Sequence, residues 1–239
     1  MIEVRGSEER YRGGDTEVGI ETRHAFSFGH HYDPDNLRFG ALIACNEEAL
    51  AAHAGFEEHP HRDTEIVTWV VEGALTHRDS AGNVTVVRPG DIQRLSSARG
   101  VRHVERNDAD VPLRFVQMWL APTSFGGEPS YEVVRALPDD APYAVPRAGA
   151  TLRVWRPKPG DRTALPAAAR VYVHVVRGTV TLGDARLTAG DAARLADESG
   201  AGLIASEAAE CLIWAMDAEP VYGGEGSGGP EGLLPEGTS

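Results

Sequence analysis

Residues 56–107 have the sequence FEEHPHRDTEIVTWVVEGALTHRDSAGNVTVVRPGDIQRLSSARGVRHVERN, a chain of short β-type runs separated by turn residues. The run at 65–71 is apolar and β-branched, as buried strands are. The turn residues 80–83 separate two further runs, as in a hairpin. No helical spacing of apolar residues interrupts the stretch. It therefore predicts an all-β region.

Two pairs of polar residues bracket this region. His59 and His61 lie two residues apart near its start, and His103 and Glu105 lie two residues apart near its end. Residues two apart in a strand point to the same face. If the two strands face each other inside a barrel, three imidazoles and one carboxylate converge. This set suits one divalent metal ion. The alternative is that all four are ordinary solvent-facing residues, but the double pairing favours a metal site.

Composition limits the kinds of protein that this chain can be. Its 239 residues fit one large β domain or two small ones. The formal net charge is −13, with 36 acidic against 23 basic residues. Nonspecific binding to nucleic acid needs clustered Lys and Arg, so this balance argues against it. Protein partners with basic surfaces remain open.

The cysteines and the N-terminal residues bear on the cellular compartment. Cys45 and Cys211 are expected to be two buried free thiols, with a single disulfide as the alternative. The first residues lack the apolar core of a signal peptide. No run of about 18 apolar residues suggests a membrane span. We therefore expect a cytoplasmic protein.

The second half of the chain repeats the scaffold of the first. Arg177-Gly178 occupies the place of Glu72-Gly73, and residues 188–191 parallel residues 87–91. A period of about 105 residues is too long for a solenoid and suits two barrels. We expect the limits to be 1–122 for the N-terminal metal-binding barrel, 123–149 for a linker with one strand, 150–220 for the C-terminal barrel, and 221–239 for a disordered Gly/Pro-rich tail.

The repeated half does not repeat the polar pairs. Alanines fill 167–169, where the first His pair would recur, and Gly-Leu-Ile fills 202–204, where His103 and Glu105 would recur. Only His174 is left, and a lone histidine in an apolar strand is more often structural. The second barrel is therefore expected to lack metal ligands and to serve a structural role.

Several segments carry a family resemblance. Gly55-x3-His59-Pro60-His61-x3-Glu65 resembles the first cupin motif, and Gly100-x2-His103-x3-Asn107 after Pro89-Gly90 resembles the second. More narrowly, the chain resembles the pirin family in the segments HAFSFGHHYDP, GFEEHPHRDTEIVTWVVEG, HRDSAGN, RPGDIQRLSSARGVRHVE and FVQMWLAP. This resemblance implies two tandem cupin (jelly-roll) β-barrels, a bicupin.

The resemblance also implies a ligand set. Members of this family hold a metal in the N-terminal barrel through three His and one Glu, which correspond here to His59, His61, His103 and Glu105. Fe(II) is the expected ion, with Zn, Ni, Cu or Mn as alternatives. Glu65 occupies the place of the carboxylate ligand of many other cupins. With Glu105 present, we expect Glu65 to support the ligands or to pair with a charge.

For function, the resemblance implies a quercetin 2,3-dioxygenase-like oxidation of a flavonol or similar small aromatic by O2. Glu105 would be the general base, and Phe28, Phe56 and Trp69 are possible lining residues. The alternative is a non-catalytic, metal-dependent regulatory protein with an unidentified protein partner. A third possibility, sugar isomerase or epimerase chemistry, lacks a recognisable acid–base pair. Neither direct nucleic-acid binding nor membrane association is expected.

Overall fold

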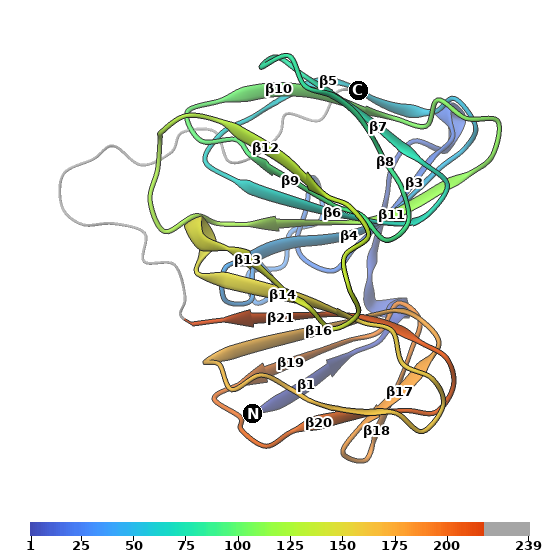
Figure 1. Ribbon diagram of the computed structural model, residues 1–239, viewed down its shortest axis with the longest axis vertical. Coiled ribbons are helices and arrows are strands. Elements are labelled where there is room, and N and C mark those ends of the chain that lie inside the picture. The colour runs from blue at the N-terminus through green and yellow to red at the C-terminus, as the bar shows by residue number, and fades with distance from the viewer. Residues whose placement is uncertain (218–239) are drawn as a thin grey trace.

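The computed structural model describes residues 1–217, and their regular elements are strands and short 3-10 helices. Two β-barrels are stacked along the long axis of the molecule (Figure 1). The all-β, two-barrel class predicted from the sequence is confirmed. The predicted tail, residues 221–239, lies outside the described residues.

The first barrel packs two antiparallel sheets against each other. The seven-stranded sheet has the order β12 (Ser130–Val134), β9 (Ile92–Ser96), β6 (Glu65–Glu72), β11 (Leu113–Leu120), β4 (Leu42–Leu50), β3 (Ile20–His24) and β2 (Tyr11–Gly13). The four-stranded sheet has the order β5 (Gly55–His61), β10 (Val101–Arg106), β7 (Leu75–Asp79) and β8 (Val84–Val87).

The second barrel has the same two-sheet plan. Its six-stranded sheet has the order β1 (Ile2–Arg5), β19 (Ala192–Ala196), β16 (Arg170–Arg177), β21 (Glu210–Met216), β14 (Ala150–Trp155) and β13 (Pro142–Val145). Its four-stranded sheet has the order β15 (Arg162–Ala164), β20 (Gly202–Ala205), β17 (Thr179–Leu182) and β18 (Ala185–Thr188). The 3-10 helices are η1 (Ser7–Glu9), η2 (Thr16–Val18) and η3 (Pro146–Ala148).

Two segments cross between the barrels. The N-terminal strand β1 pairs with β19 of the second barrel, and the chain then returns to the first barrel as β2. Pairing with β1 satisfies the backbone groups that β19 would otherwise expose at a sheet edge. Residues 123–149 hold β12, which pairs with β9, and β13, which pairs with β14. The segment therefore contains two strands, not the single strand expected, and each strand joins a different barrel. The domain limits expected from the sequence stay a prediction.

Matching turns reveal the duplication. Gly73 and Gly178 both have φ +79°, and a Cβ at either position would lie within 2.6 Å of a backbone carbonyl oxygen. Both positions therefore require glycine. The side chains of Asp91 and Asp191 accept hydrogen bonds from the backbone three residues earlier, at 3.1 and 2.7 Å. The repeat seen in the sequence thus corresponds to equivalent turns in two barrels.

A single hydrophobic core joins the two barrels. Along β6 the side chains of Val67, Trp69 and Val71 face this shared core, whereas the alternate residues fill the first barrel. Trp214 of β21 is fully buried there, and its indole Nε1 donates to the sulfur of Met118, 3.1 Å away. Burial of this apolar surface stabilises the stacked arrangement.

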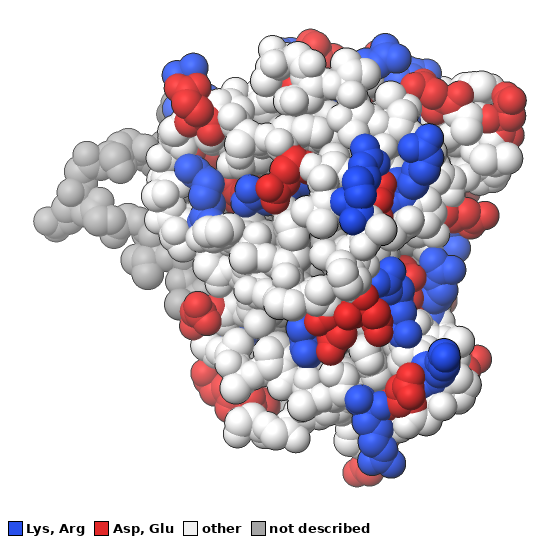
Figure 2. Space-filling view, in the orientation of Figure 1, with Lys and Arg blue, Asp and Glu red and all other residues white. Residues whose placement is uncertain are grey.

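The remaining sequence expectations concern the cysteines and the surface. Cys45 and Cys211 are free and buried, as predicted. Within residues 1–217 no helix is long and apolar enough to cross a membrane. On the face shown in Figure 2, Lys and Arg side chains lie among Asp and Glu, so the two signs of charge are mixed there.

Replacing Trp214 with Ala is expected to lower the free energy of unfolding by about 3–5 kcal/mol, because it leaves a cavity in the shared core. Urea unfolding measures the change. Tyr32→Ala, at a side chain that is 76% exposed, should change stability by less than about 0.5 kcal/mol. A loss at Trp214 no larger than that at Tyr32 would contradict the shared core.

Candidate metal centre

The predicted histidine strands are neighbours in one sheet. Antiparallel pairing of β5 with β10 places His59 directly opposite His103. The sequence argument supposes that the two strands face each other inside a barrel, whereas backbone hydrogen bonds join them side by side in one sheet. An irregularity in the ladder between His103 and Glu105 shifts the register there. Cross-strand neighbours lie close enough for their imidazoles to meet.

Three imidazoles come together at this point. The ring centroids of His59, His61 and His103 are 4.4–4.8 Å apart, and one nitrogen from each ring lies within 4.8 Å of the others. His103 is buried, whereas His59 and His61 are half-buried. The cluster is therefore anchored in the barrel and reachable from the β5 side.

Hydrogen bonding shows which nitrogens are available. His59 Nδ1 lies 2.7 Å from the carbonyl oxygen of Glu57, which can only accept, so Nδ1 carries the proton. The lone pair of His59 Nε2 is then directed at His103 Nε2, 2.9 Å away. His61 Nε2 is buried without a hydrogen-bond partner among the described residues. Backbone carbonyls orient metal-binding histidines in this way, and the donor set fits a divalent ion.

The surroundings keep two of these rings neutral. Burial, together with the neighbouring imidazoles, lowers the pKa of His61 to about 3 and that of His103 to about 2. The neutral imidazole is the form that binds metals. The environment therefore favours the ligand form at any ordinary pH.

Two glutamine side chains hold the carboxylate of Glu105. Gln93 Nε2 donates to Oε1 at 2.8 Å, and Gln117 Nε2 donates to Oε2 at 2.6 Å. Trp119 Nε1 donates to Gln117 Oε1 at 2.9 Å, and the Tyr131 hydroxyl donates to Gln93 Oε1 at 3.0 Å. Because an indole N–H can only donate, it fixes the orientation of the Gln117 amide. Both oxygens of Glu105 thus accept, as those of an ionised carboxylate do.

Glu105 adjoins the histidine cluster on its inner side. Its ligand oxygen lies within 4.8 Å of nitrogens of His103 and His77, which form a second group of three. His103 belongs to both groups. The structure therefore brings the three predicted histidines together and places Glu105 next to His103, rather than next to His59 and His61.

His77 was missed by the sequence analysis. It is fully buried on β7, its Nε2 lies 3.1 Å from Asp79 Oδ2, and its Nδ1 lies 4.0 Å from Glu105 Oε1. Its ring stacks on Tyr131 with centroids 4.4 Å apart. The available signal was the same as for the other pairs, since His77 and Asp79 stand two residues apart in a predicted strand.

Aromatic rings surround the outer side of the cluster. The ring of Trp119 meets His61 edge-on at 4.9 Å, and Phe28 meets Trp119 at 5.3 Å. Phe56 lies 6.4 Å from the ring of His59. Phe28 and Phe56 are therefore near the cluster, as the sequence analysis expected, and Trp119 is an addition to them.

Two other expected neighbours lie on the opposite face of β6. Trp69 Nε1 donates to Glu210 of the second barrel at 2.8 Å, so the expectation that Trp69 lines the site is wrong. The alternation of β6 points its side chain into the shared core. Glu65 is buried on that same face and pairs with Arg147 at 3.1 Å. Of the two roles expected for Glu65, it fills that of charge partner.

The second barrel holds a different arrangement. His174 is fully buried, with Nδ1 2.8 Å from Arg10 Nη2 and Nε2 3.2 Å from a carboxylate oxygen of Glu47. These contacts tie β16 to the N-terminal segment and to β4. Among residues 1–217, both groups of three potential metal ligands lie in the first barrel. The structural role expected for His174 is consistent with this geometry.

The fold and the histidine cluster define the chain as a two-barrel cupin protein whose N-terminal barrel can hold a metal ion. Residues 6–120 match the pirin family, and residues 147–216 match the quercetinase C-terminal cupin domain. The chain belongs to the pirin family.

Relatives and solved structures agree with this assignment. A Mycobacterium tuberculosis protein named "Putative quercetin 2,3-dioxygenase" is 42% identical over 236 residues, covering 91% of this chain and 96% of its own. The Escherichia coli quercetin 2,3-dioxygenase is 33% identical over 235 residues, covering 92% and 100%. The crystal structure of an Escherichia coli bacterial pirin in complex with nickel(II) superimposes with a TM-score of 0.83 at 30% identity, covering 91% and 100%.

Lowering the pH is expected to destabilise the metal-free protein through His61 and His103. An imidazole in the unfolded chain gains a proton below a pH of about 6.5, whereas these two stay neutral in the folded protein down to about 3 and about 2. The unfolded state then binds more protons, so the free energy of unfolding falls as the pH falls through this window.

The substitution His103→Leu removes one of the two imidazoles that gain a proton on unfolding. The decline between about pH 6 and about pH 4 should then be shallower by about 1.4 kcal/mol per pH unit. Urea unfolding over a pH series measures the slope, with His53→Leu, at an exposed imidazole, as the control. Curves that run parallel for His103→Leu and the unchanged protein would show that the cluster is not kept neutral.

Proposed function

We propose that this chain is a metal-dependent dioxygenase of the quercetinase type, with His59, His61, His103 and Glu105 as the metal ligands. The observation that carries the proposal is the convergence of the three imidazoles beside a carboxylate held by two amide donors. The Escherichia coli relative named quercetin 2,3-dioxygenase supports the reaction class.

For the ion we propose Fe(II), with Zn, Ni, Cu or Mn as alternatives that a His3Glu set also accepts. The nickel(II) in the Escherichia coli bacterial pirin shows that a relative with this fold binds a divalent ion. A divalent ion at this position supplies Lewis acidity toward the hydroxyl and carbonyl oxygens of a flavonol.

Glu105 also provides the proton acceptor. Its carboxylate takes the proton of the flavonol hydroxyl, the step expected of a general base. The amide groups of Gln93 and Gln117 stay bonded to its oxygens and fix their positions, so little reorganisation accompanies the transfer. The Tyr131 hydroxyl and the Trp119 indole N–H in turn hold the two amides, because they donate to the side-chain oxygens of Gln93 and Gln117.

The outer aromatic rings suit a flat substrate. Trp119 lies edge-to-face against His61, Phe28 lies edge-to-face against Trp119, and Phe56 lies beside His59. Aromatic rings prefer such edge-to-face and offset contacts with one another. A small polyphenol entering from the β5 side would meet apolar ring surface on its way to the ligands.

Glu105→Gln is expected to lower metal-dependent oxygen uptake with quercetin by about 100-fold or more, because the amide cannot accept the proton. The protein is purified anaerobically, loaded with Fe(II), Ni, Cu, Mn or Zn, and followed with an oxygen electrode. Glu58→Gln is the matched control, since Glu58 is exposed on β5 and pairs only with Arg102 among the described residues.

Equal loss in both variants would contradict the role of Glu105. Stoichiometric metal binding without oxygen uptake for any of the five ions would instead favour the non-catalytic regulatory protein. That result would support the proposed metal site and contradict the proposed dioxygenase reaction.

Gln117→Leu is expected to weaken metal affinity by about 10–100-fold, as loss of a contact behind a ligand does. The substitution leaves Glu105 Oε2 without its amide donor, so that only Gln93 still positions the carboxylate. Competition with a chromophoric chelator measures the affinity, and circular dichroism verifies the fold. An unchanged affinity in a folded variant would show that Gln117 does not position the ligand.

A further inference from the structure

A second polar site lies between the barrels, away from the histidine cluster. A cavity of about 70 Å³ opens where the N-terminal segment passes from β1 to β2. Its lining includes Arg5, Glu9, Arg10, Asn36, Tyr172 and Arg194. At 10–15 Å³ for each water molecule, the volume holds about five waters or one small oxyanion.

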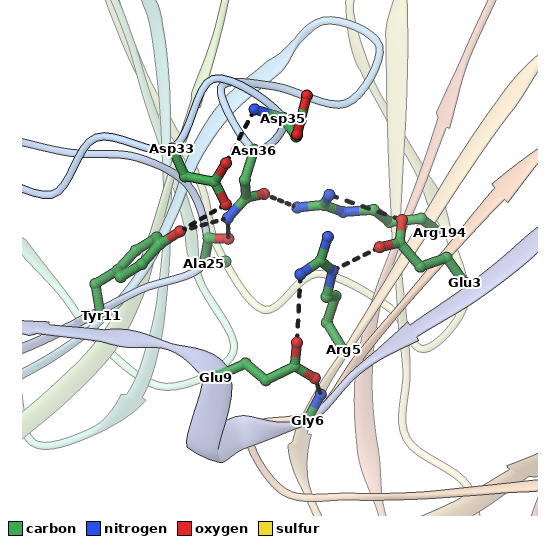
Figure 3. Close-up of polar contacts among 10 residues, drawn as sticks. All are labelled: Glu3, Arg5, Gly6, Glu9, Tyr11, Ala25, Asp33, Asp35, Asn36 and Arg194. Carbon is green, nitrogen blue, oxygen red and sulfur yellow. Dashed lines mark hydrogen bonds and ion pairs between the residues drawn. The ribbon is translucent and has the colours of Figure 1, made fainter.

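The lining is rich in positive charge. Three arginines face the cavity together with one carboxylate, that of Glu9. Arg5 Nη1 donates to this carboxylate at 3.3 Å, and Arg5 Nε donates to Glu3 at 2.6 Å. Figure 3 shows the guanidinium groups of Arg5 and Arg194 next to each other, with the carboxylate of Glu3 beside both, 2.6 Å from Arg5 Nε and 3.9 Å from Arg194 Nη1.

Arg194 is the least satisfied of the three. It is 5% exposed, and its guanidinium lies 4.6 Å from the ring centroid of Phe26. Its Nη2 donates to Asn36 Oδ1 at 2.6 Å, but Nη1 stays 3.9 Å from Glu3, and Nε is buried without a hydrogen-bond partner among the described residues. A buried guanidinium with unused donors is destabilising, so an acceptor here would be favourable.

Two further groups are held in place around the cavity. Arg10 donates from Nε to Gly190 O at 2.8 Å and from Nη1 to Cys45 O at 3.0 Å. These two backbone carbonyls fix the position of its guanidinium group. The hydroxyl of Tyr172 is buried next to the thiol of Cys45 and has no nitrogen or oxygen hydrogen-bond partner among the described residues. Burial raises the pKa of Tyr172, so the hydroxyl remains an O–H donor.

The side-chain amide of Asn36, which accepts from Arg194, is also held in a fixed orientation. Asn36 Nδ2 donates to Ala25 O at 3.1 Å, which turns Oδ1 toward Arg194. Tyr11, whose hydroxyl donates to Asp33 Oδ2 at 3.2 Å, supports the same loop (Figure 3). The cavity is thus built from the N-terminal segment, a loop of the first barrel and two strands of the second.

We propose that this cavity binds one small oxyanion, either inorganic phosphate or a short carboxylate such as acetate, through Arg194, Arg5 and the Tyr172 hydroxyl. Guanidinium groups recognise both kinds of oxyanion with paired N–H donors. The bound anion would join the N-terminal segment to both barrels. The site is independent of the metal centre and of the reaction proposed there.

Thermal unfolding and isothermal titration test this proposal on the full chain with phosphate, acetate and chloride at constant ionic strength. Phosphate or acetate should raise the unfolding temperature in a saturable way, and the difference between them identifies the anion. Chloride should have no saturable effect. A wild-type protein that binds neither oxyanion saturably would overturn the proposal and leave a cavity filled with water.

Variants locate the binding. Arg194→Gln should lower the affinity for the anion by at least 10-fold. The matched Arg186→Gln, at an exposed arginine on β18, should leave this affinity unchanged. If Arg194→Gln fails to fold, Tyr172→Phe decides, because it keeps the ring and removes the hydroxyl. A several-fold loss in Tyr172→Phe supports the site. Equal affinity in that variant and the unchanged protein overturns it.

Discussion

The antiparallel pairing of β5 with β10 is the constraint on which the candidate metal centre depends. It sets His59 opposite His103, and the pleat adds His61 on the same face. A shift of this register by one residue would put His103 on the face opposite to His59 and His61. On its other side β10 pairs with β7, which places Asp79 opposite His103 and His77 opposite Glu105. Sheet register, more than any single side chain, therefore creates the site.

The sequence predicted the part of the site that depends on local periodicity. The i, i+2 spacing placed His59 with His61, because a strand imposes that alternation whatever its neighbours are. Strand order is a long-range property, so adjacency of β5 and β10 could not be derived from spacing. The same limit hid Gln93, Gln117 and Tyr131. Two amides in apolar strands were a signal that buried polar partners must exist.

The fold shows why the chain needs a barrel without ligands. The shared core buries Trp69 and Trp214 between the barrels, so the second barrel covers the outer face of the sheet that carries Gln93 and Gln117. The duplication was visible in the sequence because its turns demand glycine at fixed positions, as at Gly73 and Gly178. The N-terminal crossing by β1 was not predictable, since a four-residue edge strand carries little pattern of its own.

The central claim is that one divalent ion binds to His59, His61, His103 and Glu105 together. Anomalous diffraction at the iron edge, from crystals grown with Fe(II) under anaerobic conditions, tests it most directly. The account predicts one strong anomalous peak per chain, in contact with all four side chains. A peak confined to His77, His103 and Glu105, or no peak in the first barrel, would contradict it.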